Sequence, residues 1–591
     1  MTFDRLLSRS QEQLLKLLRR RIWLQELLQP TDWQMILLWA AVVGVLGALT
    51  AALFTGCTEG VHELLTGSRA GVVESMRLLP RWAVVVIPTL GGLCAGLVIH
   101  FGQHLAPKAR STDYMEAILI GSGHIPFRAS IVKSTAAMFS IGSGGSIGRE
   151  GPLVQLAAVV ASRLGRWRKM PPPRQRLLVA CGAAAGIASA YNAPIGGSFF
   201  VAEIILGTIA MESLGPLVVS AVAATLVTRL LTHTSQLYAV PAYHLESGWE
   251  MVPCVLLGLI SGVAAPWFLR SLRLAETAFL GLRFPLPARL AAGGLVVGLL
   301  AMQVPEVCGN GYTVVGGILR GEFVWSALLV ILLCKWLATA SSFGSGAPGG
   351  VFTPSLFMGA SLGFLLGTGF HAVWPAAAAD PRAFAIVGMG AFLSAASHAP
   401  VMAIILMFEM TLNYDVILPL MLSSVVAYFT AKSIEGRSLY SESLRKKTAA
   451  APWEAVLERN HVAALMRPDP PTLQLHASFA EIARLFLSHR FNHLYVVDPG
   501  GRFLGVISLH DIKPFLQQTE LARVVLASDI IHENFPRLRS EQSLGECLGQ
   551  FSGVSAERLP VIDDTGRLVG SLAKGDLLLA LSERTAAPAA A

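Results

Sequence analysis

A single glutamate, Glu150, lies in a glycine-rich segment, residues 148–152, that leads into an apolar helix. The first N–H groups of a helix have no partner within it, and a helix start carries about half a positive charge, so the two together attract an anion. A second such start is expected at residues 349–354. An ionised carboxylate at this place could stand where an anion would bind. We therefore predict an anion site with Glu150 as its gate and candidate proton carrier.

The two glycine-rich segments belong to a tandem duplication. Residues 133–152 read KSTAAMFSIGSGGSIGREGP and residues 335–354 read KWLATASSFGSGAPGGVFTP, an offset of 202. A second pair, residues 182–203 and 388–409, follows at an offset of 206, with Ala-Pro and the final glutamate in register. Paired segments that Gly and Pro interrupt at matching positions of two halves indicate a transporter site at the repeat interface.

Composition indicates a membrane protein. The 591 residues are 53% hydrophobic and 14% charged, against roughly 25% charged in an average soluble domain. Apolar runs such as residues 34–56 and 82–101 can cross a bilayer, but several others are shorter than the roughly 20 residues that a straight crossing needs. Half-helices are expected, and these persist at membrane depth only where protein or a water-filled cavity satisfies the backbone.

The ends of the membrane part carry clustered basic residues. By the positive-inside rule, the cluster around residues 16–21 and the one at 437–447 both stay in the cytoplasm. The number of crossings is then even, which permits two halves of inverted orientation. The net charge of +8 suits these segments and requires no nucleic-acid partner. Seven isolated cysteines indicate neither a disulfide framework nor a zinc site.

A soluble α/β domain is expected after about residue 450. Residues 494–512 match residues 559–577 at an offset of 65, each reading as strand, tight turn, strand and helix. The copies resemble a pair of CBS motifs, which often bind adenine nucleotides. The ligand pattern wants Ser or Thr three residues before an aspartate. Ser508 meets it before Asp511, whereas Ala573 stands at that place before Asp576.

One nucleotide site is therefore a candidate, and a ligand-free structural or dimerising domain is the alternative. The expected layout is a cytoplasmic amphipathic helix at 1–32, two membrane repeats at 33–240 and 241–445, a linker at 446–460 and the CBS pair at 461–591.

GSGGSIGREGP, GSGAPGGVFTP and a late Leu-Tyr-Ser at 439–441, followed by paired CBS motifs, resemble the CLC family of chloride channels and proton/chloride antiporters, its bacterial branch in particular. The resemblance implies an all-α membrane protein with two inverted repeats. It further implies a homodimer in the inner membrane, with one anion path per subunit, cytoplasmic termini and CBS domain, and no required cofactor. The residues carried over are the external gating glutamate Glu150, the amide donors Val351 and Phe352, the hydroxyl donor Tyr440, and the loop residues Gly148, Arg149 and Gly151.

Two positions depart from the family pattern. The family's first anion motif, GSGIP, supplies a serine, but the similar GSGHIP at 121–126 places Ser122 only 28 residues before Glu150, too near. We place the serine at Ser111 instead. In the antiporters two adjacent glutamates commonly end the helix that follows, the second serving as the internal proton relay. Here Glu203 matches the first and Ile204 occupies the relay place, so Glu203 is either part of a proton path or structural.

The function we predict is chloride transport, with proton-coupled exchange gated by Glu150 favoured over a passive channel. An enzyme is not expected. A CBS-regulated divalent-cation transporter is a remoter alternative and would need a cluster of intramembrane carboxylates. A hydrolase using Ser361, in a segment that reads like a nucleophile elbow, would need a base within hydrogen-bond reach.

Overall fold

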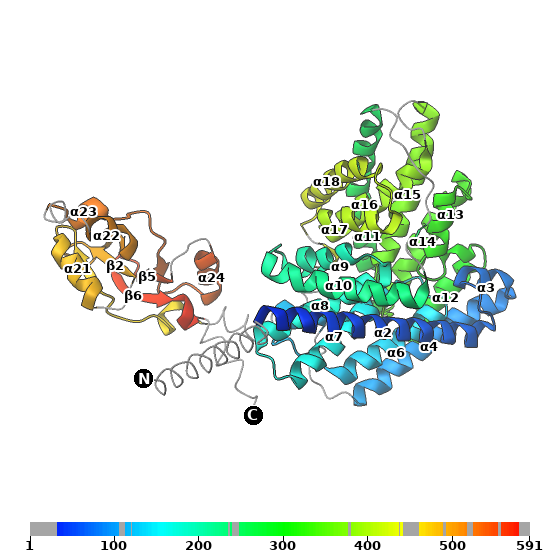
Figure 1. The fold of residues 1–591 in the computed structure, drawn as a ribbon, viewed down its shortest axis with the longest axis horizontal. Coiled ribbons are helices and arrows are strands. Elements are labelled where there is room, and N and C mark those ends of the chain that lie inside the picture. The colour runs from blue at the N-terminus through cyan, green and yellow to red at the C-terminus, as the bar shows by residue number, and fades with distance from the viewer. Residues whose placement is uncertain are drawn as a thin grey trace, which may run out of the picture. The chain divides into compact units, whose positions relative to one another are not determined.

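The computed structural model describes residues 32–105, 113–119, 121–233, 237–238, 248–375, 380–436, 438–440, 460–488, 492–516, 524–552 and 557–577. The chain divides into two compact units, residues 1–442 and 443–591, which are considered separately (Figure 1). The amphipathic helix expected before residue 32, most of the linker expected at 446–460, and Ser111 lie outside the described residues.

The described part of the first unit is helical. Seven of its helices are long and apolar enough to cross a membrane. They are α2 (Asp32–Thr66), α4 (Arg81–Leu105), α10 (Met211–Thr232), α11 (Met251–Gly281), α14 (Trp325–Gly344), α15 (Phe352–Val373) and α18 (Ile417–Ile434). The other α-helices are α3 (Val72–Leu78), α5 (Tyr114–Leu119), α6 (Phe127–Gly142), α7 (Glu150–Trp167), α8 (Pro172–Tyr191), α9 (Pro194–Phe199), α12 (Leu286–Ala301), α13 (Tyr312–Arg320), α16 (Pro381–Ser397) and α17 (Pro400–Thr411).

Short helical turns connect or extend several of these elements. They are the π-helix η1 (Phe200–Leu206), which continues α9, and the 3-10 turns η2 (Gly248–Glu250) and η3 (Pro305–Val307). The mixture of long and short apolar helices is the broken-helix architecture that the sequence predicts.

The duplication appears as matching helix ends. Helices α6 and α14 both end at a serine cap that is followed by a glycine in the left-handed conformation, Gly144 at φ +97° and Gly346 at φ +92°. A side chain is strained at such a φ, so the two GSG motifs set the same turn. The chain then reverses, and α7 and α15 begin at Glu150 and Phe352.

The second pair of repeats is also matched locally. Helices α8 and α16 end at left-handed residues, Asn192 at φ 56° and His398 at φ 58°. An Ala-Pro pair follows each, and Pro194 and Pro400 open α9 and α17, where a missing N–H costs nothing. His398 packs its ring edge-on against Tyr428, with ring centroids 6.0 Å apart, as a packed polar residue would.

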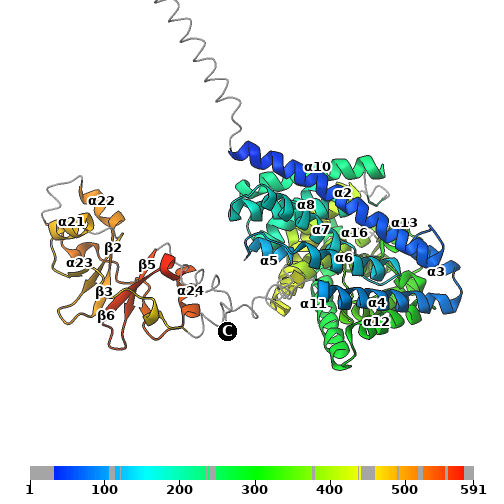
Figure 2. The same cartoon turned by 90° about the horizontal axis from the view of Figure 1, so that it is seen from below.

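Close helix contacts hold the membrane unit together. Helix α2 packs on α8 and α10, and α4 lies along α12 (Figure 2). Between α15 and α16 a Cβ on Gly359 would lie 2.4 Å from the Gly388 carbonyl oxygen, and the reverse holds for Gly388. The glycines of the elbow-like segment thus let two backbones meet, a common device in membranes. Ser361, within it, is buried, and among the described residues its hydroxyl has no hydrogen-bond partner, so none of them is a base bonded to it.

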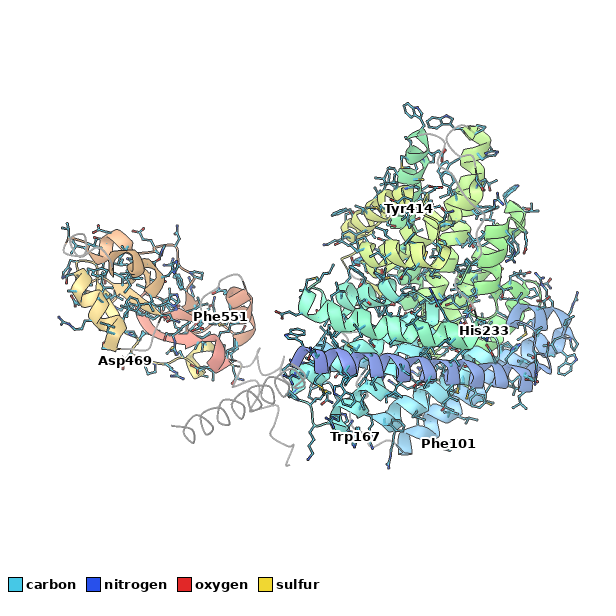
Figure 3. All side chains as sticks on the ribbon, viewed as in Figure 1. Phe101, Trp167, His233, Tyr414, Asp469 and Phe551 are labelled. Carbon is cyan, nitrogen blue, oxygen red and sulfur yellow. The ribbon has the colours of Figure 1, made fainter. Side chains whose placement is uncertain are left out.

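Large apolar and aromatic side chains cover the outside of this unit. Among those labelled in Figure 3, Phe101 on α4 is 62% exposed and Trp167 at the end of α7 is 74% exposed. Aromatic rings at helix ends are typical of the membrane–water interface, and lipid is the medium in which such a surface is stable.

The second unit contains two three-stranded sheets of the same design. One is built from β1 (Thr472–Gln474), β2 (His493–Val497) and β3 (Phe503–Ser508), and the other from β4 (Leu538–Arg539), β5 (Arg558–Ile562) and β6 (Leu568–Ala573). In each sheet the first pair of strands is parallel and the second antiparallel. The helices are α21 (Phe479–Ser488), α22 (Leu509–Leu516), α23 (Ala527–Ile530) and α24 (Leu544–Ser552), with a 3-10 turn η5 (Val462–Ala464).

The two copies of this unit pair with one another. The Phe503 N–H donates to the Gly566 carbonyl and the Leu568 N–H to the Gly501 carbonyl, both at 3.0 Å. Phe503 corresponds to Leu568 and Gly501 to Gly566 at the offset of 65, so each copy makes the same bond to the other. The copies are therefore related by a local two-fold axis.

Candidate functional site

The two glycine-rich loops of the membrane repeats meet directly. The Gly148 N–H donates to the Gly350 carbonyl and the Gly350 N–H to the Gly148 carbonyl, both at 2.8 Å. A third link joins the Ser146 hydroxyl to that of Thr339 at 3.0 Å. Each glycine donates to the other in the same way, which indicates that a pseudo-two-fold axis relates the two repeats. If that axis lies in the membrane plane, the repeats have inverted orientations. The starts of α7 and α15 therefore lie on either side of one short bridge.

Glu150 of the first repeat binds the helix start of the second. Its carboxylate accepts the Thr353 N–H at 3.0 Å and the Thr353 hydroxyl at 2.9 Å. The side chain is only 3% exposed. The acid and the second helix start, which lie 203 residues apart in sequence, are in contact, as the anion-site hypothesis requires.

Both bridging glycines leave space for this carboxylate. A Cβ on Gly148 would lie 2.1 Å from Glu150 Oε2, and one on Gly350 would lie 2.4 Å from Oε1. Any side chain at either position would push the carboxylate away. Gly151 has more room, since its Cβ would be 3.5 Å from the Gly350 nitrogen.

Hydroxyl groups surround the carboxylate on the Thr353 side. Tyr191, at the end of α8, has its hydroxyl 3.0 Å from Thr353 Oγ1. The Tyr312 hydroxyl lies beside Thr353 and Tyr191 and is buried without a hydrogen bond of ordinary geometry. Thr353 and Tyr191 are both fully buried, at 0% exposure.

The other predicted anion ligands gather around an aromatic column. Phe352, whose ring is 1% exposed, lies 5.1 Å from the Tyr191 ring and 6.1 Å from Phe200. Phe200 in turn contacts the Tyr440 ring at 5.5 Å. Val351 caps the start of α15 directly before Phe352. Val351, Phe352 and Tyr440 are therefore brought to the same region as Glu150, with Phe200 between the last two.

Arg149 faces a cavity on another side of Glu150. Its guanidinium carbon lies 5.4 Å from the centre of the Tyr312 ring, and its Nε is buried with no hydrogen-bond partner among the described residues. Both residues line a cavity of about 690 Å³. An arginine on an aromatic face keeps its charge available to an anion in such a space.

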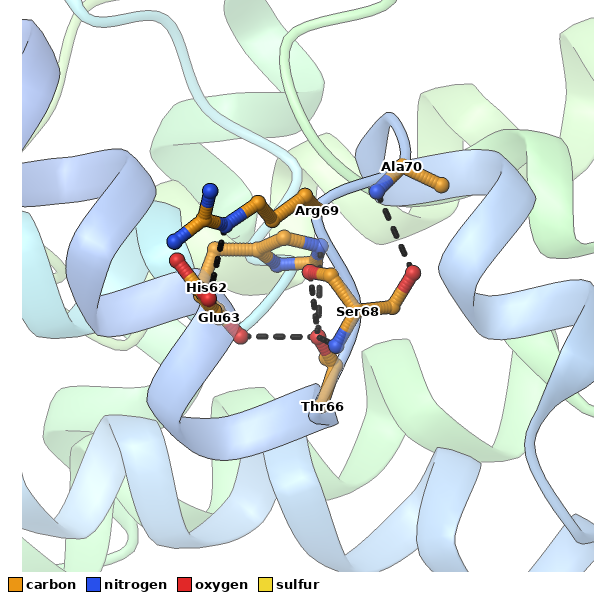
Figure 4. Close-up of polar contacts among 6 residues, drawn as sticks. All are labelled: His62, Glu63, Thr66, Ser68, Arg69 and Ala70. Atoms are coloured by element: carbon orange, nitrogen blue, oxygen red, sulfur yellow. Dashed lines mark hydrogen bonds and ion pairs between the residues drawn. The ribbon is translucent and has the colours of Figure 1, made fainter.

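The end of α2 forms another wall of this cavity. Figure 4 shows the polar contacts among its last residues and the turn that follows. Arg69 Nε and Glu63 Oε1 pair at 2.8 Å, and the buried His62 bonds the Gly142 carbonyl at 2.9 Å and the Ser75 hydroxyl at 3.0 Å. His62 thereby ties α2 to Gly142, the last residue of α6 and the first of the GSG motif. These bonds link the cavity wall to the segment that leads into the site.

The GSGHIP loop is far from Glu150. Its Gly123 carbonyl accepts from the Ser162 hydroxyl at 2.7 Å, and Ser162 is 12 residues along α7 from Glu150, about 18 Å at the usual helical rise. Ser122 therefore belongs to the far end of α7. Tyr114, three residues after Ser111, donates its N–H to Gln155 of α7 at 3.0 Å. Ser111 itself stays a prediction.

The comparisons with known proteins bear on this geometry. A family model described as "Voltage gated chloride channel" matches residues 91–432, more than half of the chain. A ClcB-like protein of Ralstonia nicotianae is 48% identical over 411 residues, which is 69% of this chain and 96% of that protein. The chain belongs to the CLC family. A voltage-gated ClC-type chloride channel, ClcB, of Salmonella dublin is 40% identical, again covering 69% of this chain and 98% of the relative.

Solved structures agree with the CLC assignment. A slow cyanobacterial Cl⁻/H⁺ antiporter superposes with a TM-score of 0.63 at 26% identity, covering 71% of this chain and 99% of that one. A eukaryotic CLC transporter shares the fold with a TM-score of 0.61 at 21% identity over 92% of this chain and 97% of its own. The CBS family model matches residues 462–517 and 527–583. The predicted family, the membrane fold of two repeats with broken helices, and the CBS pair are confirmed.

Two glutamates at repeat-related positions clasp the halves of this CLC membrane unit. Glu203, in η1, accepts the N–H groups of Val401 at 3.2 Å and Met402 at 2.6 Å, at the start of α17. Glu409, at the end of α17, accepts those of Ile195 at 3.0 Å and Gly196 at 2.6 Å, at the start of α9. Each carboxylate satisfies the free donors of a helix start in the other repeat. Glu203 thus makes the hydrogen bonds that the structural alternative requires.

In the CBS pair each predicted aspartate already has partners. Asp511 accepts the Ser508 N–H at 2.9 Å and lies 3.2 Å from His532 Nε2, while Asp576 pairs with Arg467 at 2.9 Å. His532 and Arg467 are themselves 65 residues apart, so each copy supplies a base to the acid of the other. Both bases are more than 60% exposed, and such pairs are weak enough for a ligand to displace.

Sequence reasoning missed two residues at the CLC site, Thr353 and Tyr191. The repeat carried a signal for both, because Gly151 stands at the place of Thr353 and Ser397 at that of Tyr191. The Thr353 hydroxyl and the Tyr191 phenol ring, each present in one copy only, break the symmetry beside the acid that also only one copy carries. Among the described residues no group of three or more His, Cys, Asp or Glu is placed to hold a metal ion. The divalent-cation alternative therefore gains no support from them.

Proposed function

We propose that this CLC protein moves chloride across the membrane in exchange for protons, with Glu150 as gate and proton carrier. One observation carries the proposal: the buried Glu150 carboxylate accepts the N–H at the start of α15. A carboxylate on a donor that a helix start leaves free stands in for a free anion. Chloride, which has the same charge, can take that place once the side chain leaves it.

Protonation supplies the exchange. A neutral carboxylic acid binds backbone N–H groups less strongly than a carboxylate, because the charge-assisted hydrogen bond is lost. Protonated Glu150 therefore yields its place to chloride. A further anion that enters the path repels the anion already bound and favours its departure. A second anion position would lie next to this one along the path. Its donors would be the N–H groups of Val351 and Phe352 and the Tyr440 hydroxyl, together with the Ser111 hydroxyl from the segment before α5.

Arg149 would gather anions at the mouth of the path. Its charge lies in the wall of the 690 Å³ cavity and next to the gate. The field of a partly buried cation attracts chloride without binding it so tightly that release becomes slow.

A passive channel is the second candidate, and one residue favours it. Ile204 stands in η1 where the antiporters place their internal relay glutamate, and the neighbouring Glu203 is already committed to two backbone N–H groups. Protons from inside must then reach Glu150 through water or another acid. We expect proton movement to be less tightly coupled to chloride movement than in an antiporter that has the internal relay glutamate.

The assembly we propose follows the CLC family. Two copies would associate in the inner membrane, each with its own path, and both termini and the CBS pair would face the cytoplasm. Transport itself would need no cofactor.

Chloride efflux from liposomes that contain the purified protein tests the proposal. Under an outward chloride gradient, and with no proton gradient imposed, we expect chloride efflux together with proton uptake into the liposomes. The reversal potential should lie between the chloride and proton equilibrium potentials. Efflux with a reversal potential equal to that of chloride alone would establish the channel, and an absence of efflux would reject both.

We also propose that the first CBS motif binds an adenine nucleotide through Ser508 and Asp511. ATP titrated into the full-length protein should raise its melting temperature, and Asp511→Ala should remove this rise. Asp498→Ala, at the exposed turn before β3, serves as the matched control and should keep it. No rise in the wild type at millimolar ATP would leave the ligand-free structural domain as the better account.

A further inference from the structure

The Thr353 side chain is used differently from other hydroxyls on its helix. Ser355 and Thr368 of α15 donate to carbonyls four residues back, both at 2.8 Å. Thr353 is the second residue of α15. Its hydroxyl donates to Glu150 instead, beside its own N–H. One residue thus gives both of its donors to one carboxylate.

The hydrogen-bond directions in this group are fixed by chemistry. An ionised carboxylate only accepts, so the Thr353 hydroxyl must point its hydrogen at Glu150. Thr353 Oγ1 is then left as an acceptor toward the Tyr191 hydroxyl, 3.0 Å away, which must donate to it. A donor that itself accepts a hydrogen bond becomes more polarised, particularly where water is excluded.

Tyr191 is held where it can do this. Its ring is fully buried, 5.1 Å from the Phe352 ring and 6.4 Å from that of Tyr312. Rotation of the ring away from Thr353 would require these neighbours to move. The Tyr191 hydroxyl is therefore preorganised for Thr353 in the resting arrangement.

We propose that Thr353 and Tyr191 form a latch on the gate: two positioning residues whose hydroxyls hold ionised Glu150 in the anion place. The latch is selective for charge. Protonation removes the negative charge that strengthens both hydrogen bonds from Thr353, so the Thr353 and Tyr191 hydroxyls hold neutral Glu150 less tightly than ionised Glu150. The strength of the latch then sets how much acid, or how much chloride, is needed to open the path. This inference rests on the proposed role of Glu150.

Thr353→Ala, Thr353→Ser and Tyr191→Phe, each in the full-length protein, test the latch in chloride-loaded liposomes from about pH 4.5, near the ordinary carboxyl pKa, to about pH 8. A hydrogen bond to a charged group contributes enough to change an equilibrium by about tenfold or more. We expect Thr353→Ala to raise chloride turnover at neutral pH about tenfold and to flatten its rise toward acid pH. Thr353→Ser should behave as the wild type. Tyr191→Phe should fall between the wild type and Thr353→Ala.

Combination with Glu150→Ala separates this inference from the proposed function. If Glu150 is the target, adding Thr353→Ala or Tyr191→Phe to Glu150→Ala should change turnover no further, because coupled residues are not additive. Unchanged turnover and pH profile in both Thr353→Ala and Tyr191→Phe, with a clear effect of Glu150→Ala, would overturn the latch alone. An unchanged profile in Glu150→Ala would overturn the proposed function itself. Should Thr353→Ala fail to fold, Tyr191→Phe decides in the same way.

Discussion

Replacement of Glu150 by alanine is expected to leave chloride flux in place and to reduce proton movement to the background of protein-free liposomes. The side chain is the only acid in the two glycine-rich copies, and its carboxylate occupies the donors at the start of α15. Without it the anion place is open at every pH, and the described site offers no other carboxylate to carry a proton. The measurement is simultaneous recording of chloride efflux and external pH.

Two further variants sharpen this result. Glu150→Gln keeps the size but not the charge, so it should also abolish proton movement and make chloride flux independent of pH. Glu322→Ala removes an exposed glutamate that is paired with Arg320 on the surface, and it should behave as the wild type. Proton transport that persists in both Glu150 variants would show that the proton path does not pass through this residue.

Loss of either clasp glutamate is expected to destabilise the membrane unit strongly. Glu203→Ala strands the N–H groups of Val401 and Met402, and Glu409→Ala strands those of Ile195 and Gly196. Two hydrogen bonds to a charged group together contribute about 3 kcal/mol. Both alanine variants should lower the melting temperature of the detergent-solubilised protein by a similar amount.

The same residues separate a structural role from a proton path. Glu203→Gln keeps one acceptor oxygen, so it should retain part of the stability. It should also leave the ratio of protons to chloride unchanged if Glu203 only supports α17. Glu409→Gln is the matched control at the other clasp. A Glu203→Gln protein of normal stability that no longer moves protons would show that Glu203 lies on the proton path.

Much of the fold could be read from the duplication. Two GSG motifs at one offset predict two identical turns, and Gly144 and Gly346 adopt the same left-handed conformation. The proximity of Glu150 to the start of the second repeat's helix also followed, because a two-fold axis between the copies brings equivalent loops together.

Contacts between the repeats could not be predicted in the same way. Tyr191 and Thr353 are 162 residues apart and lie in different pairs of repeated segments, so only their packing at the bridge reveals the shared hydrogen bond. The sequence aligns Glu203 with Glu409 and so predicts that the two glutamates are equivalent. It does not predict their partners, because each binds backbone N–H groups, which carry no side-chain signal. The basic residues Arg467 and His532 were not predicted either, because they lie outside the CBS pattern and each pairs with the aspartate of the other copy.

In the mechanism we propose, a chloride ion and the Glu150 carboxylate compete for one place at the start of α15. Crystals of Glu150→Gln grown in bromide would test this most directly by anomalous diffraction. We expect an anomalous peak within hydrogen-bond distance of the Thr353 nitrogen, at the position of the wild-type carboxylate, and a much weaker peak there in the wild type. Peaks of equal height in the two proteins, or bromide bound only away from Thr353, would contradict it.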